Sequence, residues 1–146
     1  KWHVPLVLGE WGAYFDQPET KAISEFHVKQ IEANEWSQTY WSYYEGYFTS
    51  PTARVLERPY PQAINGKLHA YHYDPATQQF DLTYKAFPGT SRIFVPHLHT
   101  VAISQLAEQG VRRPRKNFPS QPGSESGVLF ITADAEQEVV LHLHIG

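Results

Sequence analysis

Glu10 has the setting that most favours chemistry in this chain. It follows an apolar run over residues 5–8, and glycines stand at positions 9 and 12. A short continuous apolar run is typical of a strand buried on both faces, as in a parallel sheet. We therefore expect Glu10 where such a strand ends, which in a barrel of parallel strands is the chemical face. A structural glutamate paired with a buried arginine is the alternative that position alone leaves open.

Aromatic side chains supply the second set of candidates. They make up 14% of the chain and are concentrated in its first half, and aromatic rings can stack on the apolar faces of sugars. Packing in the core is the alternative for every such ring, and a solvated loop charge is the alternative for a neighbouring carboxylate. The candidate substrate-binding residues are Trp41, Trp11, Tyr43, Tyr44 and Glu45.

Two histidine pairs, at positions 97 and 99 and at positions 142 and 144, place two imidazoles on one face of an extended segment. Two such pairs can bind a metal, but a polar strand face alternating with buried leucines is the preferred interpretation. The chain has no cysteine, which excludes disulfides, zinc–thiolate sites and a cysteine nucleophile. We therefore predict no metal and no cofactor.

Charge and length limit the partners. The net charge of −3 argues against nucleic acid, and no apolar run approaches the roughly 20 residues of a membrane span. The basic run over residues 112–116 suits a phosphate or an anionic lipid headgroup, so a peripheral membrane contact stays open beside a solvated loop.

The chain also contains no methionine and enters a strand within a few residues of Lys1. We expect it to be the C-terminal part of a longer protein. The location of that protein stays open, with an extracellular or secreted one favoured.

The elements around Glu10 predict a strand–helix–strand unit. The first strand extends to residue 9, the helix covers residues 19–34, and the second strand covers residues 37–43. Such a unit implies a right-handed crossover and a parallel sheet. The helix has a broken apolar face, formed by Ala22, Ile23, Phe26 and Ile31. Residues 58–66 predict a short final helix, with proline near its start and Gly66 as its stop.

After Gly66 the hydrophobic period changes to two, which is typical of strands. Residues 68–73 and 79–84 predict a hairpin around the turn Asp74-Pro75-Ala76-Thr77. Residues 100–107 fit a helix or a strand, and residues 112–127 predict a loop. Further strands are expected at residues 91–95, 127–133 and 138–145. Together they favour a small antiparallel sandwich, with one domain over residues 1–66 and another over residues 67–146.

Several of these motifs resemble glycoside hydrolase family 5. Gly9-Glu10-Trp11-Gly12 matches the pattern at the end of the seventh barrel strand in that family, and Tyr40-Trp41-Ser42-Tyr43 resembles the end of the eighth. Residues 58–66, which begin Arg-Pro-Tyr-Pro, resemble the linker of the endoglycosylceramidase-like branch. So do the two segments after it, Tyr71-His72-Tyr73-Asp74-Pro75 and Phe80-Asp81-Leu82-Thr83-Tyr84.

The resemblance implies the C-terminal fragment of a (β/α)₈ TIM barrel, an α/β fold, followed by a small antiparallel β-sandwich domain. It implies a retaining β-glycoside hydrolase in which Glu10 is the nucleophile. In that family, Trp41 would form the floor of the subsite that binds the cleaved sugar. The substrate would be a β-glycoside, either a glycolipid or an oligosaccharide.

The family's acid/base glutamate belongs to an Asn-Glu-Pro motif that lies upstream of this segment and is absent. Asn34-Glu35 is followed by Trp36 instead of proline, so we expect Glu35 to be an ordinary surface residue. The partner of this chain is then the missing N-terminal barrel portion, and the chain alone is expected to be inactive.

Two other functions stay open. One is a carbohydrate- or lipid-binding β-sandwich module, which a line of exposed coplanar aromatics would favour. The strands after Gly66 offer Tyr71, Tyr73, Phe80 and Tyr84, which alternate as core or edge residues do. The other is a family 5 glucanase that acts on polysaccharide.

Overall fold

The computed structural model describes residues 4–12, 18–42, 44–106, 110–119 and 125–146. The chain divides into two compact units, Lys1–Glu57 and Arg58–Gly146, and each is described by itself. No helix among the described residues is long and apolar enough to cross a membrane.

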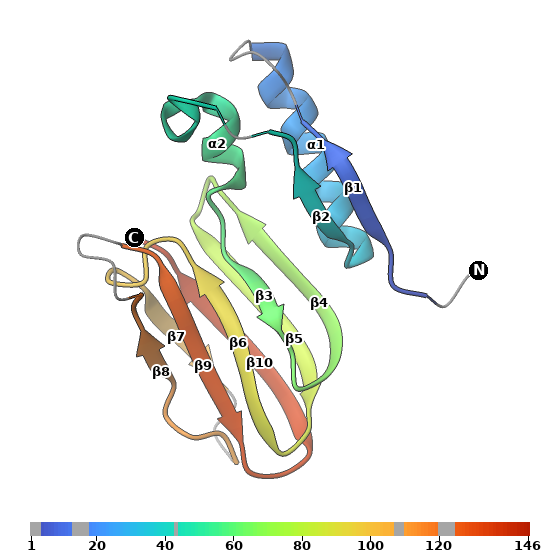
Figure 1. The fold of residues 1–146 in the computed structure, drawn as a ribbon. Coiled ribbons are helices and arrows are strands. Elements are labelled where there is room, and N and C mark those ends of the chain that lie inside the picture. The colour runs from blue at the N-terminus through green and yellow to red at the C-terminus, as the bar shows by residue number, and fades with distance from the viewer. Residues whose placement is uncertain (1–3, 13–17, 43, 107–109, 120–124) are drawn as a thin grey trace. The chain divides into compact units, whose positions relative to one another are not determined.

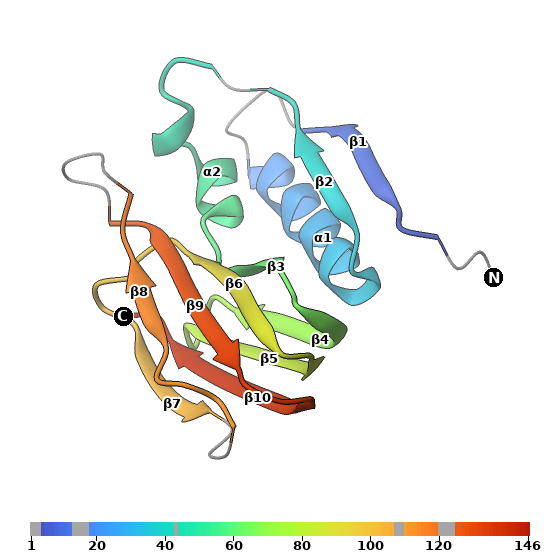
Figure 2. The same cartoon turned by 60° about the horizontal axis from the view of Figure 1, so that its bottom comes forward.

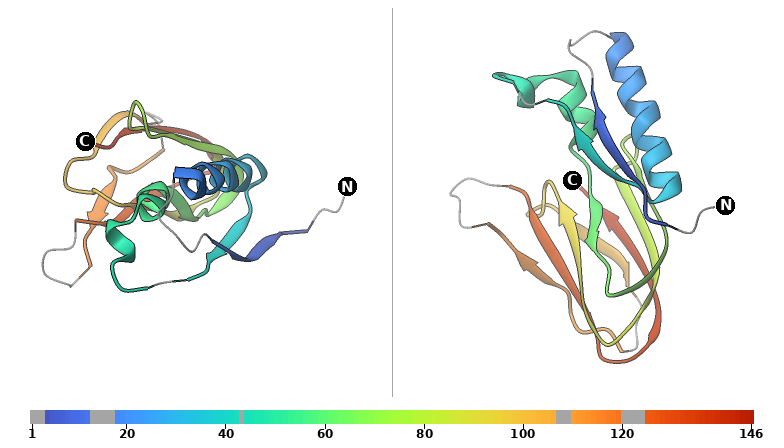
Figure 3. Two further views of the ribbon diagram at one scale, coloured as in Figure 1. Left: turned by 90° about the horizontal axis from the view of Figure 1, so that it is seen from above. Right: turned by 45° about the vertical axis from the view of Figure 1, so that its right-hand side comes forward.

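The first unit is a parallel strand–helix–strand arrangement, as predicted. Strands β1 (Val7–Trp11) and β2 (Ser37–Tyr40) pair in parallel. Helix α1 (Pro18–Asn34) connects them and covers one face of the pair, as Figures 1 and 3 show. A small apolar core lies between the helix and the strands, formed by Trp11, Val28, Ile31 and Val55.

The buried face of α1 differs from the predicted one. Val28 and Ile31 are buried together with Ser24, whereas Ile23 and Phe26 are 50% and 60% exposed. Positions 24, 28 and 31 follow the spacing that puts residues on one helical stripe. The apolar residues of the sequence are divided between two stripes, and only one of them faces β1 and β2.

The expectation that the first strand is buried on both faces is also wrong for the described residues. Leu6 is 51% exposed and Val7 is 66% exposed. Helix α1 covers one face of the strand, and no described residue of this unit covers the other. Strand β1 also pairs with β2 along one edge only.

Two short helices end the first unit. The 3₁₀ helix η1 spans Tyr47–Thr49 and helix α2 spans Pro51–Leu56. Ser50 caps α2, because its Oγ accepts a hydrogen bond from the amide of Ala53 at 3.0 Å, and Pro51 occupies the first turn where no amide donor is needed. The prediction of a final helix over residues 58–66 is therefore wrong. That segment contains a strand and belongs to the second unit.

The second unit is a sandwich of two four-stranded antiparallel sheets, which Figure 2 shows as two layers. One sheet has the order β4 (Gly66–Asp74), β5 (Gln79–Ala86), β10 (Gln137–His144) and β7 (Ala102–Leu106). The other has the order β3 (Tyr60–Ala63), β6 (Gly89–Val95), β9 (Gly127–Ala133) and β8 (Arg115–Asn117). All neighbouring strands pair antiparallel.

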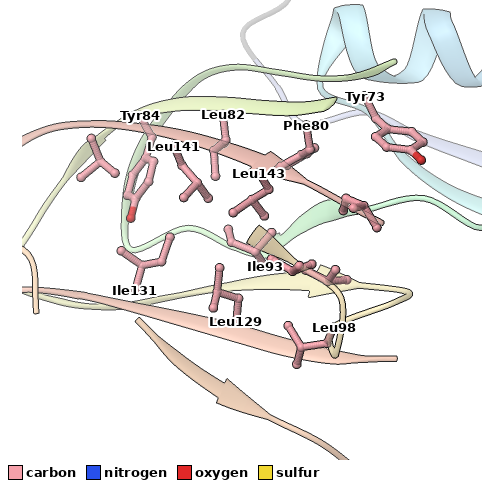
Figure 4. Packing of buried hydrophobic residues seen from close by; sticks show 14 of the residues in the cluster. Tyr73, Phe80, Leu82, Tyr84, Ile93, Leu98, Leu129, Ile131, Leu141 and Leu143 are labelled. Carbon is pink, nitrogen blue, oxygen red and sulfur yellow. The ribbon is translucent and has the colours of Figure 1, made fainter. Parts of the chain in front are cut away.

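The sandwich core forms from alternate residues of the strands, so the period of two in the sequence is confirmed. In β5, every second residue from Phe80 to Ala86 is buried. Figure 4 shows side chains of both sheets pointing toward one another, among them Leu82 and Leu141 of one sheet and Ile93 and Leu129 of the other. The predicted hairpin is β4–β5, and both oxygens of Asp74 accept bonds within the turn, from the amide of Ala76 and the hydroxyl of Thr77 at 2.9 Å.

Two strands of the second sheet were not predicted. Strand β8 lies inside the expected loop, and all three of its residues are exposed, so its sequence carries no hydrophobic alternation. Strand β3 follows Pro59 and contains Pro61. As an edge strand it tolerates proline, because the missing amide costs no bond on the open side. The ambiguous segment around residues 102–106 is strand β7.

Candidate active site

A β-bulge at Gly9 sets the direction of Glu10. The parallel register runs Val7↔Ser37 and Leu8↔Gln38, then resumes with Glu10↔Thr39 and Trp11↔Tyr40. Gly9 is thus an extra residue on β1. A bulge of this kind re-aims the side chains that follow it.

The bulge explains why Leu8 and Trp11 both pack in the core under α1. Residues three apart in a regular strand point to opposite faces, so without the extra residue one of them would leave the core. Glu10, which directly precedes Trp11, points to the face opposite the helix and is exposed. This is the face that would line the interior of a closed barrel.

Trp11 is enclosed, with 8% of its surface exposed. Its ring stacks on His27 with centroids 4.9 Å apart and meets Tyr40 edge-on at 5.3 Å. Its Nε1 donates to Oε1 of Gln38 at 2.8 Å. Sequence reasoning did not single out His27 for this contact, since nothing in a helix sequence indicates which strand side chain a residue will meet. Trp11 is thus a core residue of this unit.

Trp41 directly follows β2 and is 52% exposed. Its amide donates to the carbonyl oxygen of Trp11 at 2.7 Å, which fixes its backbone next to the end of β1. Glu10 and Trp41 therefore come from neighbouring strand ends, as the sequence motifs implied.

The other aromatic candidates follow in the loop after β2. Tyr44 is 36% exposed, and its ring meets that of Tyr47 edge-on with the centroids 5.6 Å apart. The ring centroids of Tyr47 and Tyr40 are 5.4 Å apart. Burial, together with the neighbouring phenols of Tyr40 and Tyr44, raises the pKa of Tyr47 to about 12, so this hydroxyl stays protonated and can donate. Glu45 is exposed in the same loop, and the remaining candidate, Tyr43, lies outside the described residues.

Glu35 lies at the other end of the unit. It is exposed, follows the last turn of α1 with a positive φ of 55°, and precedes β2. Because β1 and β2 run in parallel, the start of β2 and the end of β1 lie at opposite ends of the strand pair. Glu35 is therefore separated from Glu10, as expected for a surface residue.

One histidine of each pair lies against a carboxylate. Nδ1 of His97 lies 3.1 Å from Oε2 of Glu125, and Nδ1 of His142 is hydrogen-bonded to Oδ1 of Asp81. Within the described part of the chain, no group of three or more His, Cys, Asp or Glu side chains is placed to hold a metal ion.

A parallel strand–helix–strand piece followed by an antiparallel sandwich is the architecture of the C-terminal third of a glycosidase with an appended sandwich domain. Residues 58–142 match the model of the glycoside hydrolase family 5 C-terminal domain, and the chain belongs to that family. No protein with a curated description matches it.

Solved structures show the same fold. Endo-glycoceramidase II from Rhodococcus sp. is 18% identical, with a TM-score of 0.67, and the match covers 98% of this chain and 34% of that one. Sterylglucosidase 1 of Cryptococcus neoformans is 10% identical, with a TM-score of 0.59, and the match covers 94% of this chain and 28% of that one. The chain thus spans about a third of the length of these enzymes.

Proposed function

We propose that this chain is the C-terminal part of a retaining β-glycosidase in which Glu10 is the nucleophile. The observation that carries the proposal is the bulge at Gly9, which turns Glu10 away from α1 while Leu8 and Trp11 stay in the core. In a closed barrel this face lines the interior, and the end of a barrel strand is where such folds carry their catalytic residues. The Rhodococcus enzyme, which shares the fold, has been solved as a lactosyl-enzyme intermediate.

In the proposed reaction, the ionised carboxylate of Glu10 attacks the anomeric carbon and forms a glycosyl-enzyme ester. A second carboxyl group, about 5–5.5 Å away, protonates the leaving oxygen and later takes a proton from the water that cleaves the ester. That acid/base residue would come from the missing N-terminal portion, because Glu35 precedes β2 and so lies at the opposite end of the strands from Glu10.

Trp41 would form the floor of the subsite next to Glu10, with Tyr44 and Glu45 on the same side of the unit after β2. We assign Trp11 a positioning role instead, because its ring is already stacked on His27. The names of the two solved relatives refer to glycosides of ceramide and sterol, which favours a lipid-linked β-glycoside over a polysaccharide as the substrate.

The exposed apolar residues of β1 and the segment before it are consistent with a missing part. Val4, Leu6 and Val7 are each more than half exposed, and a closed barrel of eight strands, about 250 residues in all, would cover such residues. We therefore expect the chain by itself to lack hydrolytic activity.

The aromatics of the strands after Gly66 do not form the line of exposed rings that would favour a sugar-binding module. Tyr73, Phe80 and Tyr84 are buried in the sandwich core, where their rings are not available to a sugar.

The test uses the complete enzyme that contains this chain and a chromogenic β-glucoside. Glu10→Gln keeps the shape of the side chain and removes the nucleophile, so kcat/KM should fall by about 1,000-fold or more. Glu35→Gln, the matched control, should leave kcat/KM within about twofold, since a surface residue remote from the site contributes little. Turnover that survives Glu10→Gln would refute the assignment.

A further inference from the structure

Two cross-strand rows of side chains lie on the outer face of the β3–β6–β9–β8 sheet. In the first row, the rings of Tyr60 and Phe94 are stacked, with centroids 5.0 Å apart and planes at 28°. In the second row, Arg92 and Arg115 lie opposite Phe130 from its two neighbouring strands. Their guanidinium carbons are 6.0 and 4.9 Å from the centroid of the Phe130 ring. We call these five residues the basic-aromatic face.

The strand alternation shows that this face points away from the sandwich core. Leu129 and Ile131, on either side of Phe130, are 0% and 1% exposed. Ile93, between Arg92 and Phe94, is also fully buried. The residues between these core positions must therefore lie on the outer side of the layer that Figure 2 shows. Within the second unit, Arg92 and Arg115 are exposed.

Charge is divided unequally between the two sheets. The four strands that carry the basic-aromatic face contain no aspartate or glutamate, whereas those of the other sheet contain Asp74, Asp81 and Glu138. Arg112, just before β8, is neutralised by Asp134 at 2.8 Å. No carboxylate among the described residues pairs with Arg92 or Arg115, which contact the ring of Phe130 instead. In a chain with a net charge of −3, the four strands of this sheet thus carry only positive charge.

We propose that the basic-aromatic face docks on the surface of an anionic lipid bilayer. A guanidinium that lies over an aromatic ring keeps its planar fork of five donors, which matches the oxygens of a phosphate or carboxylate headgroup. Tyrosine rings suit the headgroup level, where one end is apolar and the other wet. The outer face of a sheet offers an extended surface rather than an enclosed site, which fits a bilayer better than a single small anion.

This inference is independent of the proposed hydrolysis, because docking uses residues of the second unit and none of those around Glu10. The test is sedimentation of the complete enzyme with vesicles of phosphatidylcholine, either pure or with one quarter phosphatidylserine. We expect binding to the anionic vesicles only, weakening as sodium chloride is raised, because salt screens exposed charges. Glu10→Gln should leave this binding unchanged even where it abolishes hydrolysis.

The double substitution Arg92→Gln/Arg115→Gln should weaken binding to the anionic vesicles by about 25-fold, or about fivefold for each arginine. The matched control Lys67→Gln/Lys85→Gln removes the same charge from the other sheet and should change binding by less than about threefold. Tyr60→Ala, which leaves the charge unchanged, should weaken binding as well. Circular dichroism of each variant establishes that it is folded.

Three results would overturn the proposal. Equal binding to pure phosphatidylcholine would show that attraction between the arginines and anionic lipid does not drive the docking. Unchanged binding in the double variant would place the contact elsewhere. Full competition by inorganic phosphate or free glucuronate at millimolar concentration would indicate a small-anion site instead of a bilayer surface.

Discussion

The backbone of Gly12 passes so close to Trp41 that a Cβ atom on residue 12 would stand 1.8 Å from the carbonyl oxygen of Trp41. The amide of Trp41 in turn donates to the carbonyl oxygen of Trp11 at 2.7 Å. These two contacts join the ends of β1 and β2 at the residues next to Glu10. The position of the exposed Trp41 ring therefore depends on the glycine that follows the Glu-Trp pair.

The first prediction concerns the two glycines around Glu10. Gly12→Ala requires the Trp41 backbone to move, and overpacking of this kind typically costs about 1–3 kcal/mol. We expect a lower midpoint of urea unfolding and a marked loss of kcat/KM in the complete enzyme. A Cβ atom on Gly9 would meet nothing within 4 Å, so Gly9→Ala is the matched control and should be tolerated. Equal effects of the two substitutions would contradict the role of this close approach.

The second prediction concerns the ring of Trp41. Trp41→Ala should lower kcat/KM on a chromogenic β-glucoside by about 10- to 100-fold, as expected when a substrate-positioning contact is lost. The free energy of unfolding should change little, because the ring is 52% exposed. Trp41→Phe retains a flat ring and should recover part of the activity. A large loss of stability with unchanged kinetics would show that the ring is structural.

Much of the fold was predictable because the sandwich strands alternate strictly. In β5 and β9, every second residue is buried and its neighbours are not, and this period is visible in the sequence. Strand β8 was not predictable, because Arg115, Lys116 and Asn117 are all exposed and take part in the sheet through backbone pairing alone. The prediction of a helix over residues 58–66 was wrong because proline near the start of a segment suits both a first helical turn and an edge strand.

The candidate site was predictable only as a set of residues. The motif around Glu10 indicated which carboxylate to examine and which tryptophan lies near it. The bulge at Gly9 could not be inferred, because it depends on the register with β2, a tertiary property. The fate of Trp11 was open for the same reason. The local sequence does not indicate that His27 and Tyr40 pack against the ring of Trp11, or that Trp41 is exposed instead.

The third prediction is a dependence of stability on pH that arises at Asp81. Burial opposes the ionisation of this carboxyl, but hydrogen bonds from Gln79 and His142 and the charges of His142 and His72 outweigh it, so its pKa lies below the ordinary 3.8. A carboxyl whose pKa is lower in the folded state stabilises the fold above its unfolded pKa and loses this contribution as the pH falls through the folded pKa.

Wild type should therefore exceed Asp81→Asn in the free energy of urea unfolding at pH 7. The difference should shrink as the pH falls below about 4. Because both side chains of the Asp81–His142 pair are partly exposed, we expect at most about 1 kcal/mol. In the background of His142→Gln, the same comparison should give a smaller difference. A gap that widens as the pH falls below 4 would have the wrong sign.

The fourth prediction concerns the contact between the two sheets. Leu141 of β10 is fully buried in the cluster that both sheets form. Leu141→Ala leaves a cavity that neighbouring strands cannot close and should lower the free energy of unfolding by about 2–5 kcal/mol. The adjacent Val140 points to the outer face and is only half-buried, so Val140→Ala, which truncates a neighbouring aliphatic side chain, should cost less than about 1 kcal/mol. Similar costs for the two substitutions would mean that β10 is not packed with Leu141 inward, and the sandwich register would have to be revised.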